Sequence, residues 1–226
     1  PRPRVRKEGT AVNVLLDNAD VYWRAILGTV GLFVVSAIGS LILGTLIAGL
    51  RVSPVPVLRS FGSLYVTLLR NTPLTLVLFF FAFAYPRLEL VEFSFFTLAC
   101  IGLTLYTAAF VCEIVRSGIN TVPVGQAEAA RALGFTFTQT LGQIVLPQAV
   151  RAVVPPMTNI QIALLKNTTI ASGFAVFQLG SVYSVLSERG YNVMIGLLWI
   201  AAIFVVLVVP LTLLQRRLDA KWGVAR

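Results

Sequence analysis

Histidine is absent from the 226 residues, and charged residues make up only 12% of them. A metal site or proton relay built on histidine is therefore excluded. Soluble domains carry about 25% charged residues, so the composition also excludes a soluble globular enzyme. Neither the glycine-rich phosphate loop of ATPases nor the G-x-G-x-x-G of dinucleotide-binding proteins occurs. We expect no catalytic residue, no metal and no cofactor on this chain.

Cysteine is scarce as well, since Cys100 and Cys112 are the two present. On one helix they would lie about 18 Å apart along the axis and about 120° apart around it. That geometry does not allow a disulfide between them. We expect two buried, unpaired thiols.

Several long stretches of the sequence contain no charged residue. Residues 25–50, 93–112, 167–186 and 190–215 contain no charged residue. An apolar stretch of about 20 residues crosses a bilayer core of about 30 Å. The sequence therefore predicts an all-α membrane protein that crosses the cell membrane several times.

Five transmembrane helices fit the pattern. We expect them at residues 25–50, 60–85, 93–115, 152–186 and 190–214, with Arg70 and Pro73 interrupting the second. The fourth region can be read in two ways, as one broken span followed by a short helix or as two spans. A segment of mixed polarity, residues 116–151, precedes it.

Basic residues set the orientation. With residues 116–151 in the cytoplasm, nine basic residues lie at the inner ends of the spans, whereas the outer loops hold Arg87 and Arg189. This agrees with the positive-inside rule and explains the net charge of +9 without nucleic acid. The C-terminal tail, residues 216–226, is then cytoplasmic. The N-terminal tail opposes this assignment, because its five basic residues make the tally nine against seven.

The N-terminal tail comprises residues 1–24. Within it, residues 10–24 predict a helix with one apolar side, which can lie along the membrane surface. The apolar residues are Val12, Leu15, Leu16 and Ala19. In the first span, small residues recur every four positions and predict close helix packing within the chain. They are Ser36, Ser40, Gly44 and Ala48.

The cytoplasmic segment predicts a helix–turn–helix. Residues 126–133 are strong helix formers, and Pro123 suits the first helical position. Gly134 fits the left-handed position just past a helix end. Thr136 and Gln139 have the spacing of a capping box that begins a second short helix, and Pro147 separates this helix from the next segment. The element is either a docking helix for a partner or an ordinary amphipathic connection.

A longer motif runs through this element. Glu128-Ala129-Ala130 is followed after three residues by Gly134, and nine residues later by Ile144, with Leu146-Pro147 at the end. The pattern resembles the signature of permease subunits of ATP-binding-cassette (ABC) importers. Four other stretches resemble the polar amino-acid permeases of this family, especially the glutamate-uptake group. They are Arg51-Val52-Ser53-Pro54, Arg70-Asn71-Thr72-Pro73-Leu74, Arg116-Ser117-Gly118-Ile119-Asn120-Thr121-Val122 and Leu165-Lys166-Asn167-Thr168-Thr169-Ile170-Ala171-Ser172.

The resemblance covers residues 25–215 and implies the type I ABC importer permease fold for this transmembrane domain. It implies that residues 117–150 form the coupling loop, which docks on a dimer of ATPase subunits that bind ATP and Mg²⁺. The coupling residues are Glu128, Ala129, Ala130, Arg131 and Gly134. The family also implies an extracytoplasmic solute-binding protein and a second permease subunit, identical or similar, all in contact with membrane lipid.

Three charged residues fall at membrane depth, where ions are costly. Glu113 lies one turn before Arg116, which predicts an interfacial ion pair. Arg70 is either a clamp between helices or part of the substrate path. Lys166 either reaches the outer interface or meets an anionic solute together with the polar residues that follow it. Those residues are Asn167, Thr168, Thr169 and Ser172.

We predict that the chain is a permease subunit that translocates a polar amino acid, with glutamate preferred and glutamine, aspartate and asparagine open. Asn167 stands where some relatives carry Asp, which argues against a cationic solute. A second class of function is an accessory membrane subunit that recruits a cytoplasmic partner and transports nothing. A free-standing secondary transporter is a third, but the two halves show no internal repeat.

Overall fold

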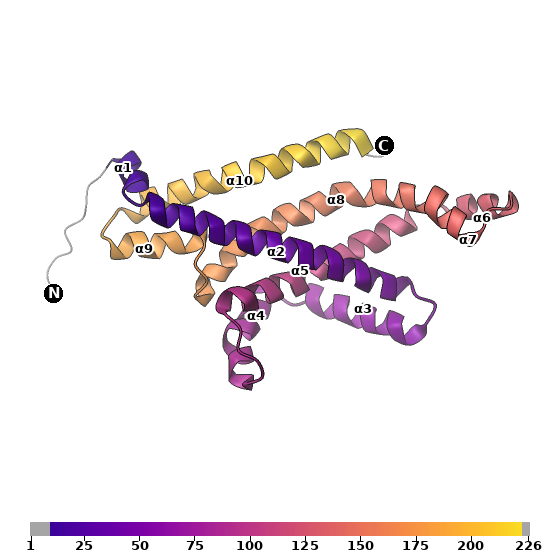
Figure 1. Cartoon of the computed structure of the whole chain (residues 1–226), viewed down its shortest axis with the longest axis horizontal. Helices are drawn as coiled ribbons and strands as arrows, with labels where there is room; N and C mark the ends of the chain where they lie inside the picture. Colours follow the sequence, from indigo (N-terminus) through magenta and orange to yellow (C-terminus); the bar gives the residue numbers. More distant parts are fainter. Residues whose placement is uncertain (1–9, 223–226) are drawn as a thin grey trace. The chain divides into compact units, whose positions relative to one another are not determined.

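The computed structural model describes residues 10–222, so the predictions on residues 1–9 and 223–226 lie outside the described residues. Within this range the chain is helical and contains no strand (Figure 1). The helices are α1 (Ala11–Leu16), α2 (Ala19–Val52), α3 (Pro56–Arg70), α4 (Leu74–Phe79), α5 (Phe95–Asn120), α6 (Val124–Ala132), α7 (Phe137–Gln139), α8 (Leu146–Asn167), α9 (Val182–Glu188) and α10 (Val193–Trp222).

Three helices, α2, α5 and α10, are long and apolar enough to cross a membrane. Two more segments qualify when each bent pair of helices is counted as one span. The pairs are Pro56–Arg70 with Leu74–Leu88, and Phe137–Phe174 with Leu179–Glu188. The described residues therefore hold three to five candidate spans, and the count of five stays a prediction.

Two predicted helix boundaries differ in the structure. The expected surface helix over residues 10–24 is split into α1 and the first turns of α2. Asn18 explains the break: its side chain is fully buried, and its amide Nδ2 donates to the carbonyl of Val14 at 2.9 Å. Val12 and Leu16 remain exposed, whereas Val14 is the buried residue of α1.

The second boundary concerns Pro147. We expected a short helix that ends before this residue, and that expectation is wrong, because the chain stays helical from Phe137 to Asn167. A π-helical turn at Thr140–Val145 precedes α8, which includes Pro147 as its second residue. The wider turn changes the backbone hydrogen-bonding register where proline cannot donate.

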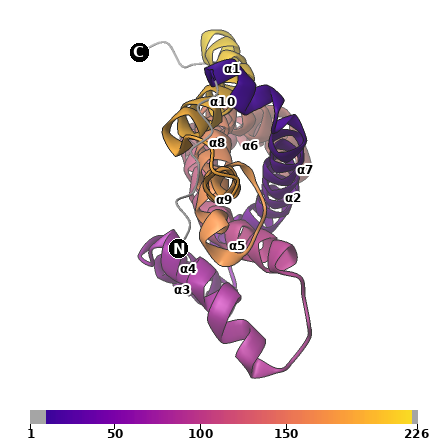
Figure 2. The ribbon, with the colours of Figure 1, turned by 90° about the vertical axis from the view of Figure 1, so that its left-hand side faces the viewer.

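The chain divides into two compact units. The first comprises the described part of Pro1–Ala37 together with Leu74–Leu103 and Ala163–Pro210. Its core joins α1, the start of α2, α9 and α10, and its buried members are Val14, Val21, Tyr22, Ala25, Leu179, Val182, Leu186 and Ile200. In this unit α1 lies beside α10, where the Trp199 indole donates from Nε1 to the carbonyl of Ala11 at 2.7 Å (Figure 2).

The second unit comprises Ile38–Pro73, Thr104–Ile162 and the described part of Leu211–Arg226. Its core contains Ile47, Ala48, Val66 and Cys112. A Cβ on Gly44 would meet the Val111 side chain at 2.6 Å, so α2 and α5 are in close contact there. The predicted packing of the small residues is confirmed, and both cysteines are buried and unpaired as expected.

Candidate functional site

The turn between α6 and α7 has the geometry that its sequence predicts. Pro123 was expected at the first helical position. It is instead the N-cap of α6, which begins at Val124. At the other end Gly134 adopts φ +88°, and its amide donates to the carbonyl of Arg131 at 3.0 Å. The next amide, that of Phe135, donates to the carbonyl of Ala130 at 3.1 Å. This pair of bonds is the Schellman motif, which glycine stabilises because it has no Cβ.

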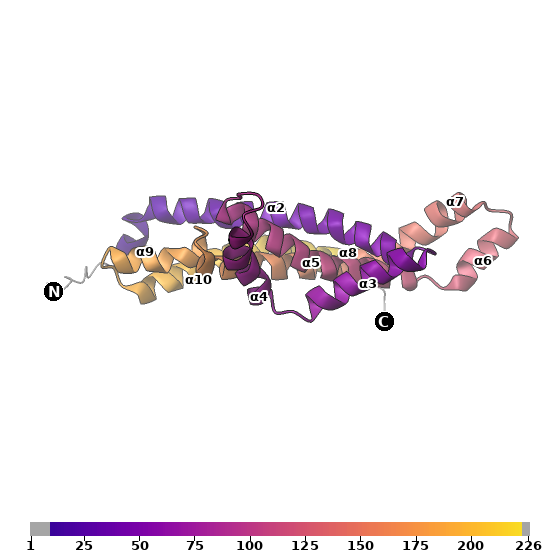
Figure 3. The same ribbon diagram turned by 90° about the horizontal axis from the view of Figure 1, so that it is seen from below.

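A capping box starts the helix that follows the turn. The amide of Gln139 donates to Thr136 Oγ1 at 3.3 Å, and the amide of Thr136 donates to Gln139 Oε1 at 2.9 Å. Both bonds satisfy amides that a helix start would otherwise leave unpaired. The turn thus has a defined shape on both sides of Gly134, and Figure 3 shows α6 and α7 on either side of it.

Four of the five predicted coupling residues are exposed in this element. They are Glu128, Ala129, Arg131 and Gly134, whereas Ala130 is buried against its own unit. Among the ion pairs of residues 10–222, none involves Glu128 or Arg131. Both charges are therefore accessible to a protein outside this chain.

The base of the element is anchored in its unit. Gln148 of α8 donates from Nε2 to the side-chain oxygen of Gln126 in α6 and to the carbonyl of Ile144 at 2.8 Å. A Cβ on Gly118 would lie 3.1 Å from the carbonyl oxygen of Ala149, so α5 and α8 are also in close contact. A side-chain hydrogen bond thus joins α6 to the start of α8.

The polar segment at the end of α8 uses most of its hydroxyl protons internally. Thr168 donates to the carbonyl of Leu165 at 2.7 Å, Thr169 to that of Lys166 at 2.8 Å, and Ser172 to that of Thr169 at 2.8 Å. The 3₁₀ turn Thr168–Phe174 contains all three donors. Their oxygens remain available as acceptors, which leaves Lys166 and Asn167 as the side chains with donors to offer.

Lys166 and Thr169 share a hollow of about 350 Å³ with α10. Its other lining residues are Phe204, Val205, Val208 and Val209. Thr168 belongs to a different face of the segment, since it is fully buried while Lys166 is exposed. The structure therefore groups Lys166 with Thr169 and separates both from Thr168.

Arg70 has partners in its own unit. Its Nη1 lies 3.5 Å from Glu113 Oε1, and its guanidinium carbon lies 5.7 Å from the centre of the Phe110 ring. Glu113 also pairs with Arg116 at 3.2 Å, so the predicted pair within α5 is confirmed. These contacts match the clamp that we considered for Arg70.

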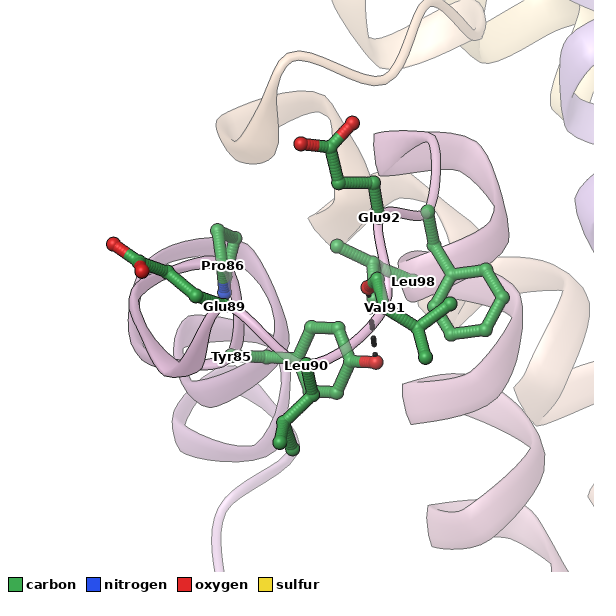
Figure 4. Close-up of a pocket in the computed structure, with 8 residues that line it drawn as sticks. Tyr85, Pro86, Glu89, Leu90, Val91, Glu92 and Leu98 are labelled. Atoms are coloured by element: carbon green, nitrogen blue, oxygen red, sulfur yellow. Dashed lines mark hydrogen bonds between the residues drawn. The ribbon is translucent and has the colours of Figure 1, made fainter.

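A second hollow, of about 540 Å³, lies in the loop between α4 and α5 (Figure 4). The Tyr85 hydroxyl donates to the carbonyl of Val91 at 3.1 Å and closes the loop. Glu89 and Glu92 contribute carboxylates to the lining. None of the sequence-predicted site residues lines this hollow.

The family of binding-protein-dependent transport system inner membrane components matches residues 40–224. The chain belongs to this family. The predictions of an ABC importer permease and of a multi-pass membrane protein are thereby confirmed.

This permease is 44% identical over 210 residues to the glutamate transport system permease protein GluC of Corynebacterium efficiens, which covers 88% of this chain and 92% of that protein. It is 34% identical over 215 residues to the probable glutamine ABC transporter permease protein GlnM of Bacillus subtilis, with coverage of 93% and 99%. A chain in the crystal structure of an amino acid ABC transporter with histidines has a TM-score of 0.86 at 25% identity, covering 92% of this chain and 96% of that one. The predicted type I importer fold is confirmed by this likeness.

Sequence reasoning missed the apolar part of this permease's exposed turn. Val124, Leu133 and Phe137 expose 73%, 80% and 76% of their surface. Large apolar side chains at the tips of two short helices would be costly in water, which is typical of a surface that a partner covers. The signal was present in the sequence as apolar residues on both sides of Gly134, but only the charged and small residues of the motif were given a role.

Proposed function

We propose that this permease imports a polar amino acid, foremost glutamate, with energy from ATP that a partner ATPase hydrolyses. The observation that carries the proposal is the exposed α6–α7 turn, a rigid docking element on a chain whose sequence contains no nucleotide-binding motif. ATP and Mg²⁺ would bind to the partner, and no step of hydrolysis would use a residue of this chain.

The exposed turn offers both kinds of contact that a docking site needs. Leu133 and Phe137 fit an apolar groove, and burying such a side chain is worth about 1.5–3 kcal/mol. Glu128 and Arg131 supply charges of opposite sign three residues apart, which fix the orientation. A dimer of ATPase subunits would carry one groove for each of two permease subunits.

Contacts in the first unit support an extracytoplasmic N-terminal end. Arg189, in the turn before α10, donates from Nη1 to Asn18 Oδ1 at 2.7 Å, and Trp199 donates to Ala11. The start of the described chain and the turn before α10 would therefore lie on one side of the membrane. The 30 residues of α10 extend about 45 Å, enough to cross, so its basic C-terminal end would be cytoplasmic.

The same contacts bear on the basic N-terminal tail. The Asn18–Arg189 bond joins the turn after α1 to the turn before α10, and the Trp199–Ala11 bond joins α1 to α10 itself. Both would offset the weak preference that positive charge alone would give. We propose an odd number of spans for this reason, and five is the number that agrees with a cytoplasmic coupling loop.

Transport would proceed by alternating access. Five spans are few for a complete path, so a second permease subunit, identical or similar, is proposed to complete it. Closure of the ATPase dimer would move α6 of each copy, and the helices joined to α6 would follow. A solute-binding protein would deliver the amino acid at the outer face, and lipid would cover the exposed sides of α10.

Solute chemistry follows from the donors that remain in the polar segment. Lys166 and Asn167 can donate to a carboxylate, whereas the oxygens of Thr169 and Ser172 can accept from an α-ammonium group. This arrangement suits an acidic or amide amino acid better than a cationic one. The names of the relatives GluC and GlnM support the same range of solutes.

The test uses the complex of permease, ATPase and solute-binding protein in proteoliposomes. ATP hydrolysis and uptake are measured with glutamate, aspartate, glutamine, asparagine and arginine. We expect glutamate to stimulate hydrolysis most and arginine not at all. Stimulation by none of the acidic or amide amino acids would refute the proposal.

An accessory subunit that transports nothing is the second candidate, and it shares the exposed turn. The two functions differ in one measurement. If vesicles retain full uptake when Glu128→Lys abolishes co-purification of the ATPase, the coupled importer is wrong and recruitment is the function of the turn.

A further inference from the structure

Glu113 lies in α5 among three arginines from three helices. Arg51, at the end of α2, donates from Nη1 to Glu113 Oε1, and Arg116 donates from Nη2 to Oε2 at 3.2 Å. Arg70, at the end of α3, has its Nη1 3.5 Å from the same Oε1. All four residues belong to the second unit, and we call them the Glu113 cluster.

The charges of the cluster do not balance, because one carboxylate faces three guanidinium groups. The side chains of Glu113 and Arg51 are 22% and 14% exposed, so water screens their interaction only in part. The Nε of Arg116 is buried without a hydrogen-bond partner in the structure. Arg70 and Arg116 are more exposed, at 46% and 38%, so their pairs with Glu113 add little to stability, which favours a role in positioning.

The three helices pack closely where the cluster lies. A Cβ on Gly62 of α3 would meet the Cγ of Arg51 at 2.7 Å, so α3 lies directly against the arginine of α2. The Tyr65 hydroxyl of α3 donates to the carbonyl of Leu105 in α5 at 2.6 Å. Glu113 therefore adds a charged link between helices that are already in contact.

The cluster also lies close to the coupling element along the chain. Glu113 precedes Asn120, the last residue of α5, by seven positions, or about 10 Å of helix. Three residues then lead to Val124, where α6 begins. The helix has no break between Glu113 and Asn120, so movement of α6 reaches the cluster through two rigid turns.

We propose that Glu113 is a positioning residue that transmits displacement of α6 to α2 and α3 and thereby ties ATP hydrolysis to solute movement. The inference rests on the proposed function, since it requires an ATPase that moves α6. Without the carboxylate the three arginines repel one another and nothing of opposite charge joins α2 and α3 to α5. In that state α6 moves while the other two helices do not follow.

The complete complex in proteoliposomes tests this inference. The solute is the labelled amino acid that stimulates ATP hydrolysis most. Its uptake and the rate of ATP hydrolysis are measured on the same vesicles. For Glu113→Gln we expect ATP hydrolysis to continue and the number of solutes moved per ATP to fall about tenfold, within the range usual for coupling between sites. The matched control is Asp20→Asn, which removes one carboxylate from an exposed pair with Arg24 and should keep the wild-type ratio.

A charge exchange separates positioning from folding. Arg51→Glu combined with Glu113→Arg restores an opposite-charge pair between α2 and α5, and we expect the ratio to recover most of the way. An unchanged ratio in Glu113→Gln overturns the inference, and so does a fall of uptake and hydrolysis in equal proportion. If that variant fails to assemble, Arg70→Gln decides, since an unchanged ratio there overturns the inference too. A wild-type complex that moves no amino acid would instead refute the proposed function, and the inference with it.

Discussion

Gly134 offers the sharpest test of the coupling turn. Its φ of +88° lies in the left-handed region, and no atom lies within 4 Å of the Cβ that a substitution would add. The cost of a side chain is therefore a backbone cost and not a clash. Asparagine tolerates this region, alanine does so less well, and β-branched valine is the least suited.

The expected magnitudes follow from this order. A left-handed conformation costs an ordinary residue about 1–2 kcal/mol, so about 2 kcal/mol for Gly134→Val lowers the equilibrium constant for forming the native turn about 30-fold. Gly134→Ala should lower it about fivefold, and Gly134→Asn less than that. Because the ATPase would bind the native turn, its apparent affinity for the permease should fall in the same order, by at most these factors.

Binding of the purified ATPase to permease in nanodiscs measures these affinities, and uptake in proteoliposomes measures the consequence. The thermal stability of the permease should change little across the series, because Gly134 contacts no core. Equal affinities for the Asn and Val variants would refute the reasoning, since they would show that the left-handed backbone is not required. A loss that follows side-chain size, with asparagine weakening binding more than alanine does, would contradict it as well.

Three further predictions concern the same surface and the polar segment. Thr136→Ala removes a cap worth about 0.5–2 kcal/mol, so the amide of Gln139 should exchange hydrogen about 2–30 times faster, with no change at Phe174. Leu133→Ser should weaken ATPase binding about tenfold with little loss of thermal stability, because burying a leucine side chain is worth about 1.5–3 kcal/mol. Equal binding would exclude Leu133 from the interface. Lys166→Gln should raise the KM for glutamate uptake about tenfold and that for glutamine less, since a hydrogen bond to a charged group is worth about 1.5–3 kcal/mol. Unchanged values for both solutes would make Lys166 an interfacial residue.

Features set by a few neighbouring residues were predictable from the sequence. Gly134 and the pair Thr136 and Gln139 define the turn through backbone sterics and local hydrogen bonds, and the structure contains both. The spacing of Glu113 and Arg116 predicted their ion pair for the same reason. Gly44 and its small neighbours were also predictable, since spacing by four puts them on one helix face.

Features that depend on tertiary packing were not predictable from the sequence. Pro147 was expected to separate two segments. The π-helical turn before it changes the hydrogen-bonding register where proline has no amide proton, and the helix continues. Asn18, in the break after α1, is buried and bonded both to Val14 and to Arg189, and Arg189 is distant in sequence. Arg51 and Arg70 reach Glu113 across helix contacts that no local pattern records.

The polar segment after α8 shows why residue type alone overestimates a binding site. Thr168, Thr169 and Ser172 carry hydroxyl groups in the apolar part of the chain. Each hydroxyl donates its hydrogen bond to the backbone carbonyl three residues earlier. In the proposed substrate path, a solute carboxylate would depend on Lys166 and Asn167 for donors. Discrimination between glutamate and glutamine would rest on the charge of Lys166. Loss of that charge should narrow the difference in uptake KM between the two solutes before it abolishes transport of either.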